Sequence, residues 1–146
     1  MKYEVPLLLL LLFSTITAFR SLKIGRKQST AVKGVLTCNG KPAVNVKVKL
    51  YNDSQGRYVE NSMDEGKTDS EGRFLLQGHE TSITSIDPIL KLYHNCDVEN
   101  AQCLKRFSIL IPNDFVSEGL EPKKTFDMGT LNLGGKFFDE GRECAS

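Results

Sequence analysis

The residues of this chain best suited to chemistry are four cysteines and two histidines. Thiols can form disulfides with one another. Thiols and imidazoles can also hold a zinc ion, or act together as nucleophile and base. Which of these applies depends first on the compartment, because an oxidising compartment converts thiols into disulfides. The six residues are Cys38, Cys96, Cys103, Cys144, His79 and His94.

The first eighteen residues have the layout of a secretory signal peptide. Lys2 is followed by an apolar run from Val5 to Phe13, and small residues end at Ala18. The run is shorter than the roughly 20 apolar residues that a membrane-spanning helix needs, which argues against a retained N-terminal anchor. We therefore predict cleavage near Ala18, a secreted, extracellular protein, and a mature chain that does not span the membrane.

Secretion predicts that the four cysteines pair with one another. Cys96 and Cys103 flank a short polar loop between two strand-like runs, so a local bridge across this hairpin has the simplest geometry. Cys38 and Cys144 would then form a long bridge that fastens the C-terminal tail to the first hairpin. Four cysteines allow three connectivities, so this pairing is an expectation and the other two stay open.

Metal binding and catalysis receive little support from the spacing. The chain has no Cys-x2-Cys pair, and His94 stands two residues before Cys96, so we expect no metal and no cofactor. His94 continues the apolar face of Leu90 and Leu92, and His79 has no nucleophile motif nearby. Acidic residues are plentiful in the expected turns, where they are usually solvated. We expect no catalytic residues.

These side chains must be positioned by β-strands, because the mature chain shows no convincing helical period. Val46, Val48 and Leu50 alternate with polar residues, and Asn39-Gly40 is a turn signal. The pattern predicts an all-β, antiparallel sandwich of seven or eight strands with immunoglobulin-like connections. Strands are expected at 31–38, 44–51, 66–68, 74–78, 89–94, 104–111, 125–133 and 135–138, with a helical turn near 113–118.

Composition and charge favour a single globular domain, expected at residues 31–146 after a basic arm at 19–30. The chain is 40% hydrophobic and 25% charged, and its net charge of +1 gives no reason to expect a nucleic-acid partner. Arg20, Lys23, Arg26 and Lys27 make the arm basic. A solvated arm is the favoured interpretation, and contact with an anionic lipid head group or glycan is the alternative.

Taken together, residues spread over essentially the whole mature chain resemble the nematode transthyretin-like family. The resemblance implies a secreted, disulfide-stabilised sandwich with transthyretin (prealbumin) topology. Most members of that family are functionally uncharacterised, and some are thought of as extracellular binding or bridging proteins. The residues are Gly34, Cys38, Gly40, Pro42, Val46-x-Val48-x-Leu50, Thr68-Asp69-x-x-Gly72-x-Phe74-x-Leu76-x-Gly78, His94-Asn95-Cys96, Ile111-Pro112 and Phe126-Asp127-x-Gly129-x-Leu131-Asn132-Leu133.

The same resemblance raises two alternatives. Hydroxyisourate hydrolases of the wider fold use a histidine in the first strand and a C-terminal Tyr-Arg-Gly-Ser sequence. In this chain residues 31–38 hold no histidine, and the last four residues are Glu-Cys-Ala-Ser. A carrier would hold a small apolar or hormone-like ligand in an oligomeric channel. Its candidate lining groups are Lys47, Lys49 and Tyr51, although an alternating lysine face is equally typical of a solvated sheet.

We predict a binding or bridging protein without enzymatic activity, whose partner is an extracellular protein, a lipid or a small apolar ligand. The expected contact surface consists of the loops 52–64, 78–88 and 112–124. Asn52-Asp53-Ser54 is an N-glycosylation sequon in an expected surface loop, so Asn52 is a candidate acceptor.

Overall fold

Ten β-strands and one 3-10 turn make up the described part of the computed structural model, residues 24–53, 61–98, 103–135 and 140–144. The predicted all-β fold is confirmed, and no helix in these ranges is long and apolar enough to cross a membrane. The predicted signal peptide lies outside the described residues. The elements are β1 (Arg26–Cys38), β2 (Lys41–Pro42), β3 (Lys47–Asn52), β4 (Asp64–Lys67), β5 (Arg73–Ser82), β6 (Pro88–His94), β7 (Cys103–Leu110), η2 (Asn113–Phe115), β8 (Ser117–Glu118), β9 (Thr125–Asn132) and β10 (Gly141–Cys144).

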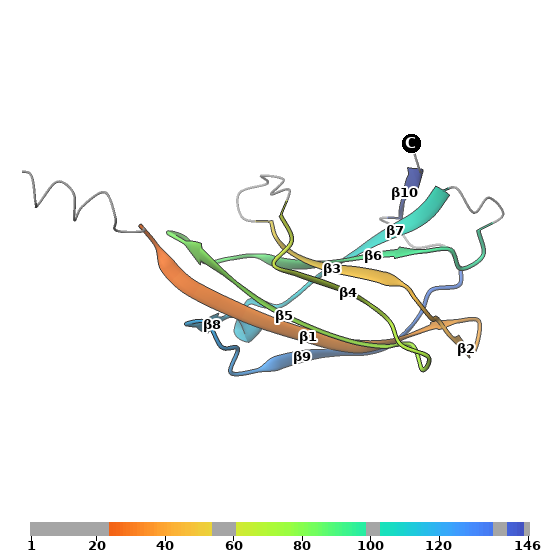
Figure 1. The fold of residues 1–146 in the computed structure, drawn as a ribbon, viewed down its shortest axis with the longest axis horizontal. Helices are drawn as coiled ribbons and strands as arrows, with labels where there is room; N and C mark the ends of the chain where they lie inside the picture. Colours follow the sequence, from red (N-terminus) through yellow and green to blue (C-terminus); the bar gives the residue numbers. More distant parts are fainter. Residues whose placement is uncertain (1–23, 54–60, 99–102, 136–139, 145–146) are drawn as a thin grey trace, which may run out of the picture.

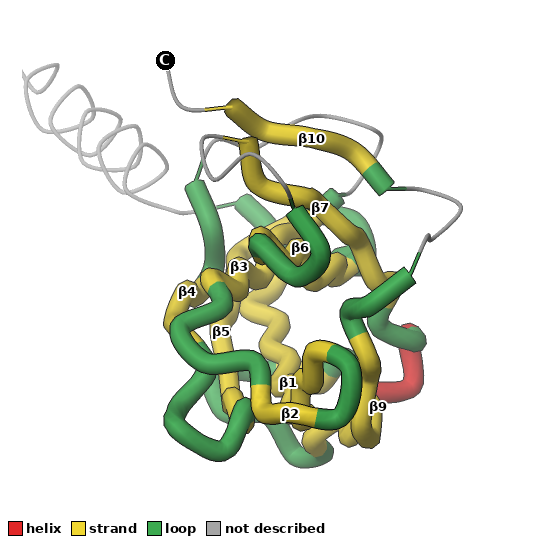
Figure 2. The backbone as a smooth tube through the Cα atoms, turned by 90° about the vertical axis from the view of Figure 1, so that its right-hand side faces the viewer, coloured by secondary structure: helices red, strands yellow, loops and turns green. Residues whose placement is uncertain are grey.

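The strands form two layers that face each other (Figures 1 and 2). Sheet A is built around β1, which pairs with β5 and β2 along one edge and with β8 and β9 along the other. Sheet B has the order β10-β7-β6-β3-β4. Every pair is antiparallel except β1 with β9. A parallel pair needs a long connection, and here the strands β3 to β7 lie between its two members in sequence.

The core lies between the sheets and follows the predicted alternation. Along β3, Val48 and Leu50 are fully buried while Lys47 is exposed. Val32 and Leu36 of β1 meet these side chains from the opposite sheet. Fully burying one such side chain contributes about 1.5–3 kcal/mol, so the facing apolar rows are what hold the layers together.

The turn before β5 shows why the Asp-x-x-Gly motif matters. The carboxylate of Asp69 accepts hydrogen bonds from the N–H groups of Glu71 and Arg73, both at 2.9 Å. The hydrogen bonds from the Arg73 and Glu71 backbone hold the pKa of Asp69 below its ordinary value. Gly72 has φ +78°, and a Cβ there would collide with the carbonyl oxygen of Leu36. Glycine is required because the turn packs directly on β1.

Several strand boundaries differ from the sequence prediction, and the largest differences are at the first and last strands. β1 begins at Arg26 instead of residue 31, so residues 26–30 of the expected arm pair with β5. The C-terminal strand is β10 (Gly141–Cys144), whereas the expected strand at 135–138 lies mostly outside the described residues. Both differences arise from pairing with distant strands, which local alternation does not reveal.

Candidate binding surface

The three predicted contact loops meet at one end of the sandwich, where β1 begins. The register pairs Arg26 of β1 with Ser82 of β5, and Asn52 at the end of β3 with Pro88 at the start of β6. We call this region the loop end and define it as Asp53, residues 83–87 and residues 110–124. Part of the first loop, 54–60, lies outside the described residues. In Figure 1 the loop end is on the side of β8.

Two surface hollows lie at the loop end. The larger, of about 460 Å³, is lined by residues of all three loops, including Asp53, Asp87 and Asn113. The smaller, of about 160 Å³, lies between β1 and the second and third loops. Ile83 and Leu110 are each 72% exposed here. The loop end therefore combines acidic groups with large apolar side chains that are open to a partner.

Gln28 of β1 ties the second loop to the sheet. Its side chain is 2% exposed, and its Nε2 donates to the carbonyl oxygens of Thr84 (2.9 Å) and Ser82 (3.4 Å). Its Oε1 accepts the N–H of Ile86 at 2.9 Å. The sequence prediction had assigned Gln28 to a solvated arm. Only the lack of charge at this position, within a basic segment, could have indicated a buried role.

The same strand also holds the third loop. Thr30 donates its hydroxyl to the carbonyl oxygen of Phe115 at 2.9 Å, and the N–H of Gly119 donates to the carbonyl oxygen of Lys27 at 2.8 Å. Arg26 forms an ion pair with Glu118 at 2.7 Å between exposed side chains. Residues 26–30 are therefore a structural element of the loop end, and not a free arm.

Asn52, the candidate glycosylation acceptor, occupies the first loop's attachment point. It is 6% exposed, and its Oδ1 accepts the N–H of Asp87 at 2.9 Å. The next residue, Asp53, donates its N–H to the carbonyl oxygen of Asp87. Asn52 thus joins the first and second loops. A buried side chain leaves no room for a glycan, so the structure weighs against occupancy, which stays untested.

The predicted cysteine pairing is wrong, although all four cysteines are in disulfides. The bonds are Cys38–Cys96 and Cys103–Cys144. The register of β6 with β7 runs up to His94 opposite Lys105 and would continue to Cys96 opposite Cys103. The chain turns after His94 and carries Cys96 into the core, while β10 brings Cys144 opposite Cys103.

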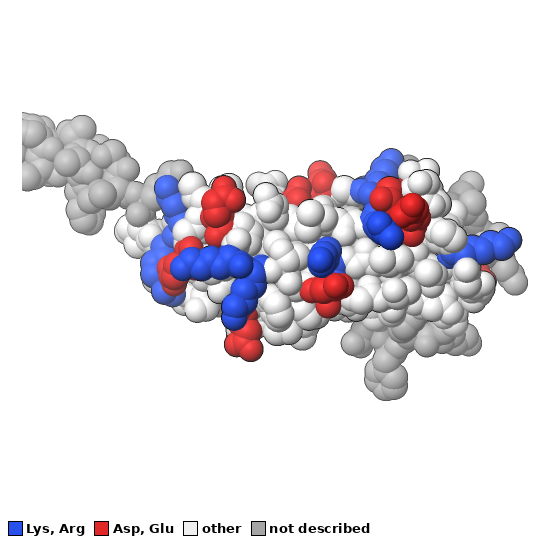
Figure 3. All heavy atoms as spheres, turned by 90° about the horizontal axis from the view of Figure 1, so that it is seen from below, with Lys and Arg blue, Asp and Glu red and all other residues white. Residues whose placement is uncertain are grey.

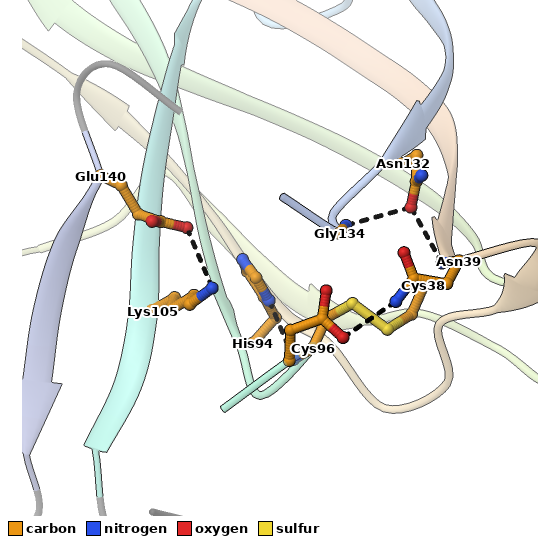
Figure 4. Close-up of a disulfide and its surroundings, with 9 residues drawn as sticks. Cys38, Asn39, His94, Cys96, Lys105, Asn132, Gly134 and Glu140 are labelled. Atoms are coloured by element: carbon orange, nitrogen blue, oxygen red, sulfur yellow. Dashed lines mark hydrogen bonds and ion pairs between the residues drawn. A yellow bond between two sulfur atoms is a disulfide. The ribbon is translucent and has the colours of Figure 1, made fainter. Parts of the chain in front are cut away.

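The Cys38–Cys96 bond joins the two sheets at the end away from the loops (Figure 4). Hydrogen bonds brace it on both sides. Asn39 donates its Nδ2 to Asp97 at 2.8 Å, and the Oδ1 of Asn132 accepts the N–H groups of Asn39 and Gly134. The disulfide and these hydrogen bonds hold the two sheets together at this end, and we call the Cys38–Cys96 bond the inter-sheet staple.

His94 lies beside the staple and faces the core, as predicted. It is 2% exposed, and its Nδ1 accepts the N–H of Cys96 at 3.1 Å. Lys105 and Glu140 form a largely buried ion pair on the neighbouring strands, with 3.8 Å between Nζ and Oε1 (Figure 4). Burial lowers the pKa of His94, with an opposing contribution from Glu140 and a reinforcing one from Lys105. His94 is thus a neutral hydrogen-bond acceptor.

The described ranges hold one cluster of potential metal ligands. The one group of donors close enough to hold an ion consists of Cys38, Cys96 and Asp97, and both thiols are consumed in a disulfide. The other histidine, His79, is exposed on β5 opposite Ser29. The structure therefore does not bring the two histidines and the cysteines into one site.

Lys47, Lys49 and Tyr51, the candidate channel-lining groups, lie together on the outer face of sheet B. The neighbouring β6 adds Lys91 and Tyr93 to the same face, opposite Lys49 and Lys47. The ammonium groups lie over the rings, with Lys91 Nζ 5.0 Å from the Tyr51 centroid and Lys49 Nζ 5.6 Å from that of Tyr93. We call these five residues, with Lys67 and Arg106 at adjoining outward positions, the lysine–tyrosine face.

The tyrosines of this face are covered by their cationic neighbours. Tyr51 is 5% exposed and Tyr93 is 8% exposed. Burial lowers the pKa of Lys49, but the nearby Tyr51 and Glu65 outweigh it, so this pKa lies above its ordinary value. Lys49 is therefore firmly protonated, and its contact with the Tyr93 ring holds it in place.

Comparison with known proteins agrees with this architecture. The model of the transthyretin-like family matches residues 33–112. The chain belongs to the transthyretin-like family. Two relatives from Caenorhabditis elegans are similar over most of their length. Transthyretin-like protein 5 is 44% identical over 83% of this chain and 87% of its own, and transthyretin-like protein 33 is 47% identical over 80% and 82%.

The family assignment agrees with the resemblance stated from the sequence. Neither relative is named for an enzymatic activity. Membership of the transthyretin-like family thus identifies the scaffold, while the partner must be argued from the surfaces.

Proposed function

We propose that this transthyretin-like protein is a secreted, non-enzymatic binding protein that recognises an extracellular protein partner through its loop end. One observation carries the proposal: hydrogen bonds tie the described parts of all three loops together at one end of the sandwich. Gln28 holds the second loop, Thr30 holds the third, and Asn52 joins the first to the second.

Anchored loops favour recognition because ordering a flexible loop on binding consumes interaction free energy. A surface whose backbone is already ordered avoids that loss. The exposed Ile83 and Leu110 supply apolar area at the loop end, and Asp53 and Asp87 supply charge at the rim of the larger hollow. This combination of apolar centre and polar rim is the usual anatomy of a protein interface.

The carrier alternative gains no support from its predicted lining groups. Lys49 lies over the ring of Tyr93 on β6, and Tyr51, which is nearly fully buried, has Lys91 of β6 over its ring. A ligand would have to displace the lysines to reach the rings.

Site-specific photo-crosslinking tests the proposal. A photoreactive side chain is placed at Ile83 or at Leu110, and the oxidised protein is exposed to extracellular fractions of the producing organism. Val44, which is 49% exposed at the opposite end, is the matched control. We expect one recurrent protein adduct from the two loop-end positions and none from Val44. Equal adducts from all three positions, or none from any, would refute the proposal.

A further inference from the structure

On the outer face of sheet B, cations lie directly opposite one another on neighbouring strands. The register sets Lys47 opposite Lys67 and Lys49 opposite Lys91. Like charges directly opposite each other in a sheet are destabilising. An anion bound on the outside of the lysine–tyrosine face would relieve this repulsion, so the positive charge there suits an anionic ligand.

Cations outnumber carboxylates among the described residues at the outward positions of sheet B. At outward positions of the five strands, the described carboxylates are Glu65 and Glu143. Glu65 lies 3.8 Å from the Nζ of Lys49, and Glu143 is paired in register with Leu104. Against them stand five cations: Lys47, Lys49, Lys67, Lys91 and Arg106.

The face of sheet A is built differently. There Lys33 lies opposite Asp127, and Arg26 pairs with Glu118. Figure 3, which views the molecule from the side of β1 and β9, shows blue and red groups adjacent to one another with uncharged surface between them. The concentration of one sign on sheet B is thus a local property and not a reflection of the overall charge, which is +1.

The cations are also pre-organised. Lys47, Lys49 and Lys91 each lie within 6 Å of a tyrosine ring centroid, at 5.9, 5.6 and 5.0 Å. Cation–π contacts of this kind restrict a side chain that would otherwise lose much of its rotamer freedom on binding. The lysine side chains therefore lose less conformational entropy when a ligand binds to their ammonium groups.

Geometry favours a linear polyanion over a membrane. The row Lys67, Lys47, Tyr93, Arg106 crosses four strands, which is roughly 14 Å at the usual strand spacing. A membrane-binding surface needs exposed apolar groups beside its cations. Of the large exposed apolar residues, Leu110 belongs to these strands, and it lies at the loop end, away from Lys47.

We propose that the lysine–tyrosine face binds a sulfated polysaccharide, independently of the protein partner at the loop end. One molecule can then hold an anionic extracellular matrix and a protein at the same time. The site uses ionic contacts, so its affinity falls as ionic strength rises.

Binding of dextran sulfate tests this, with neutral dextran and anionic phospholipid vesicles as comparison ligands, at about 0.15 M salt. The double variant Lys47→Gln/Lys91→Gln removes two cations of the face, and Lys33→Gln/Lys41→Gln makes the same charge change elsewhere. We expect the first variant to bind dextran sulfate roughly tenfold more weakly. The second should stay within about twofold of the unmodified protein, as for exposed charges outside the site.

Three results would overturn the proposal: equal weakening in both variants, no preference for dextran sulfate over dextran, or tighter binding to the vesicles. A second measurement uses the unmodified protein, so its result does not depend on whether the variants fold. Lysine acetylation of the unmodified protein, read by mass spectrometry, should be suppressed by dextran sulfate at Lys47, Lys49 and Lys91 but not at Lys33. Equal suppression at Lys33 would contradict a defined face.

Discussion

The Oε1 of Gln28 accepts the N–H of Ile86 at 2.9 Å, joining the first strand to a loop 58 residues further along the chain. This bond, with the two donated by Gln28 Nε2, makes one buried amide responsible for the second contact loop. Its loss leaves the N–H of Ile86 without its partner in a buried setting, and the carbonyl oxygen of Thr84 without its partner in a partly buried one.

Replacing Gln28 by leucine should therefore destabilise the protein. Each unsatisfied buried backbone group costs about 1–3 kcal/mol, so we expect a loss of about 2–4 kcal/mol in the free energy of unfolding. Urea unfolding measures it. Gln77, which is exposed on the same sheet, is the matched control, and Gln77→Leu should change the value by less than about 0.5 kcal/mol. Equal effects would show that Gln28 is not a special anchor.

The disulfide connectivity can be checked chemically. Cleavage after Glu99 separates Cys96 from Cys103, so non-reducing digestion should yield peptides joined as Cys38 with Cys96 and Cys103 with Cys144. Any peptide that joins Cys96 to Cys103 would contradict the structure.

Removing the inter-sheet staple should be costly. The Cys38→Ala/Cys96→Ala variant opens a loop with a sequence separation of 58, for which chain entropy predicts a loss of about 4 kcal/mol. Thermal or urea unfolding measures the loss. The Cys103→Ala/Cys144→Ala variant is the comparison, and at a separation of 41 it should lose nearly as much.

Stability should fall in mild acid because of His94. Burial depresses its pKa in the folded state, so the unfolded chain takes up a proton first as the pH drops. The contribution of neutral His94 is complete above the unfolded pKa of about 6.5 and is lost as the pH falls below it. Unfolding experiments from pH 8 to about 5 should show this slope.

Two substitutions test whether this pH dependence of stability comes from His94. His94→Asn keeps an acceptor for the N–H of Cys96 but does not titrate, so the part of the slope due to His94 should disappear. His79→Asn makes the same change at an exposed histidine and is the control. If both variants keep the original slope, the acid sensitivity has another origin.

The sequon at Asn52 should be unoccupied in the folded protein. A glycan would be attached to the Nδ2 of a side chain that is 6% accessible and that the bond from the Asp87 N–H to its Oδ1 holds in place. Glycosidase treatment of protein from a eukaryotic host should give no mobility shift. Ser54→Ala removes the sequon without touching Asn52 and should leave mobility and stability unchanged. A shift that disappears in this variant would show that Asn52 is modified.

Local pattern was enough to predict most of the longer strands but not their distant partners. The alternation around Val48 and Leu50 identified β3 correctly because one face of each strand is buried. Gln28 was missed because its burial depends on loops more than 50 residues away. The cysteine pairing failed for a related reason, since a single turn after His94 redirects Cys96 from its neighbour in the hairpin to the opposite sheet.

The site was predicted in the same uneven way. Turn-forming residues marked the three loops, and strand order then placed them at one end. The lysine–tyrosine face was only partly visible, because Lys91 and Tyr93 join Lys47 and Lys49 through register, which sequence spacing does not determine.

The Cys38–Cys96 bond closes the sandwich at the end of β1 that lies farthest from the contact loops. Residues 113–124 can therefore change with little effect on the covalent closure. A gene that duplicates can alter what its product recognises while inheriting a scaffold that still folds. Separation of the closure from the variable end makes this small domain suited to diversification.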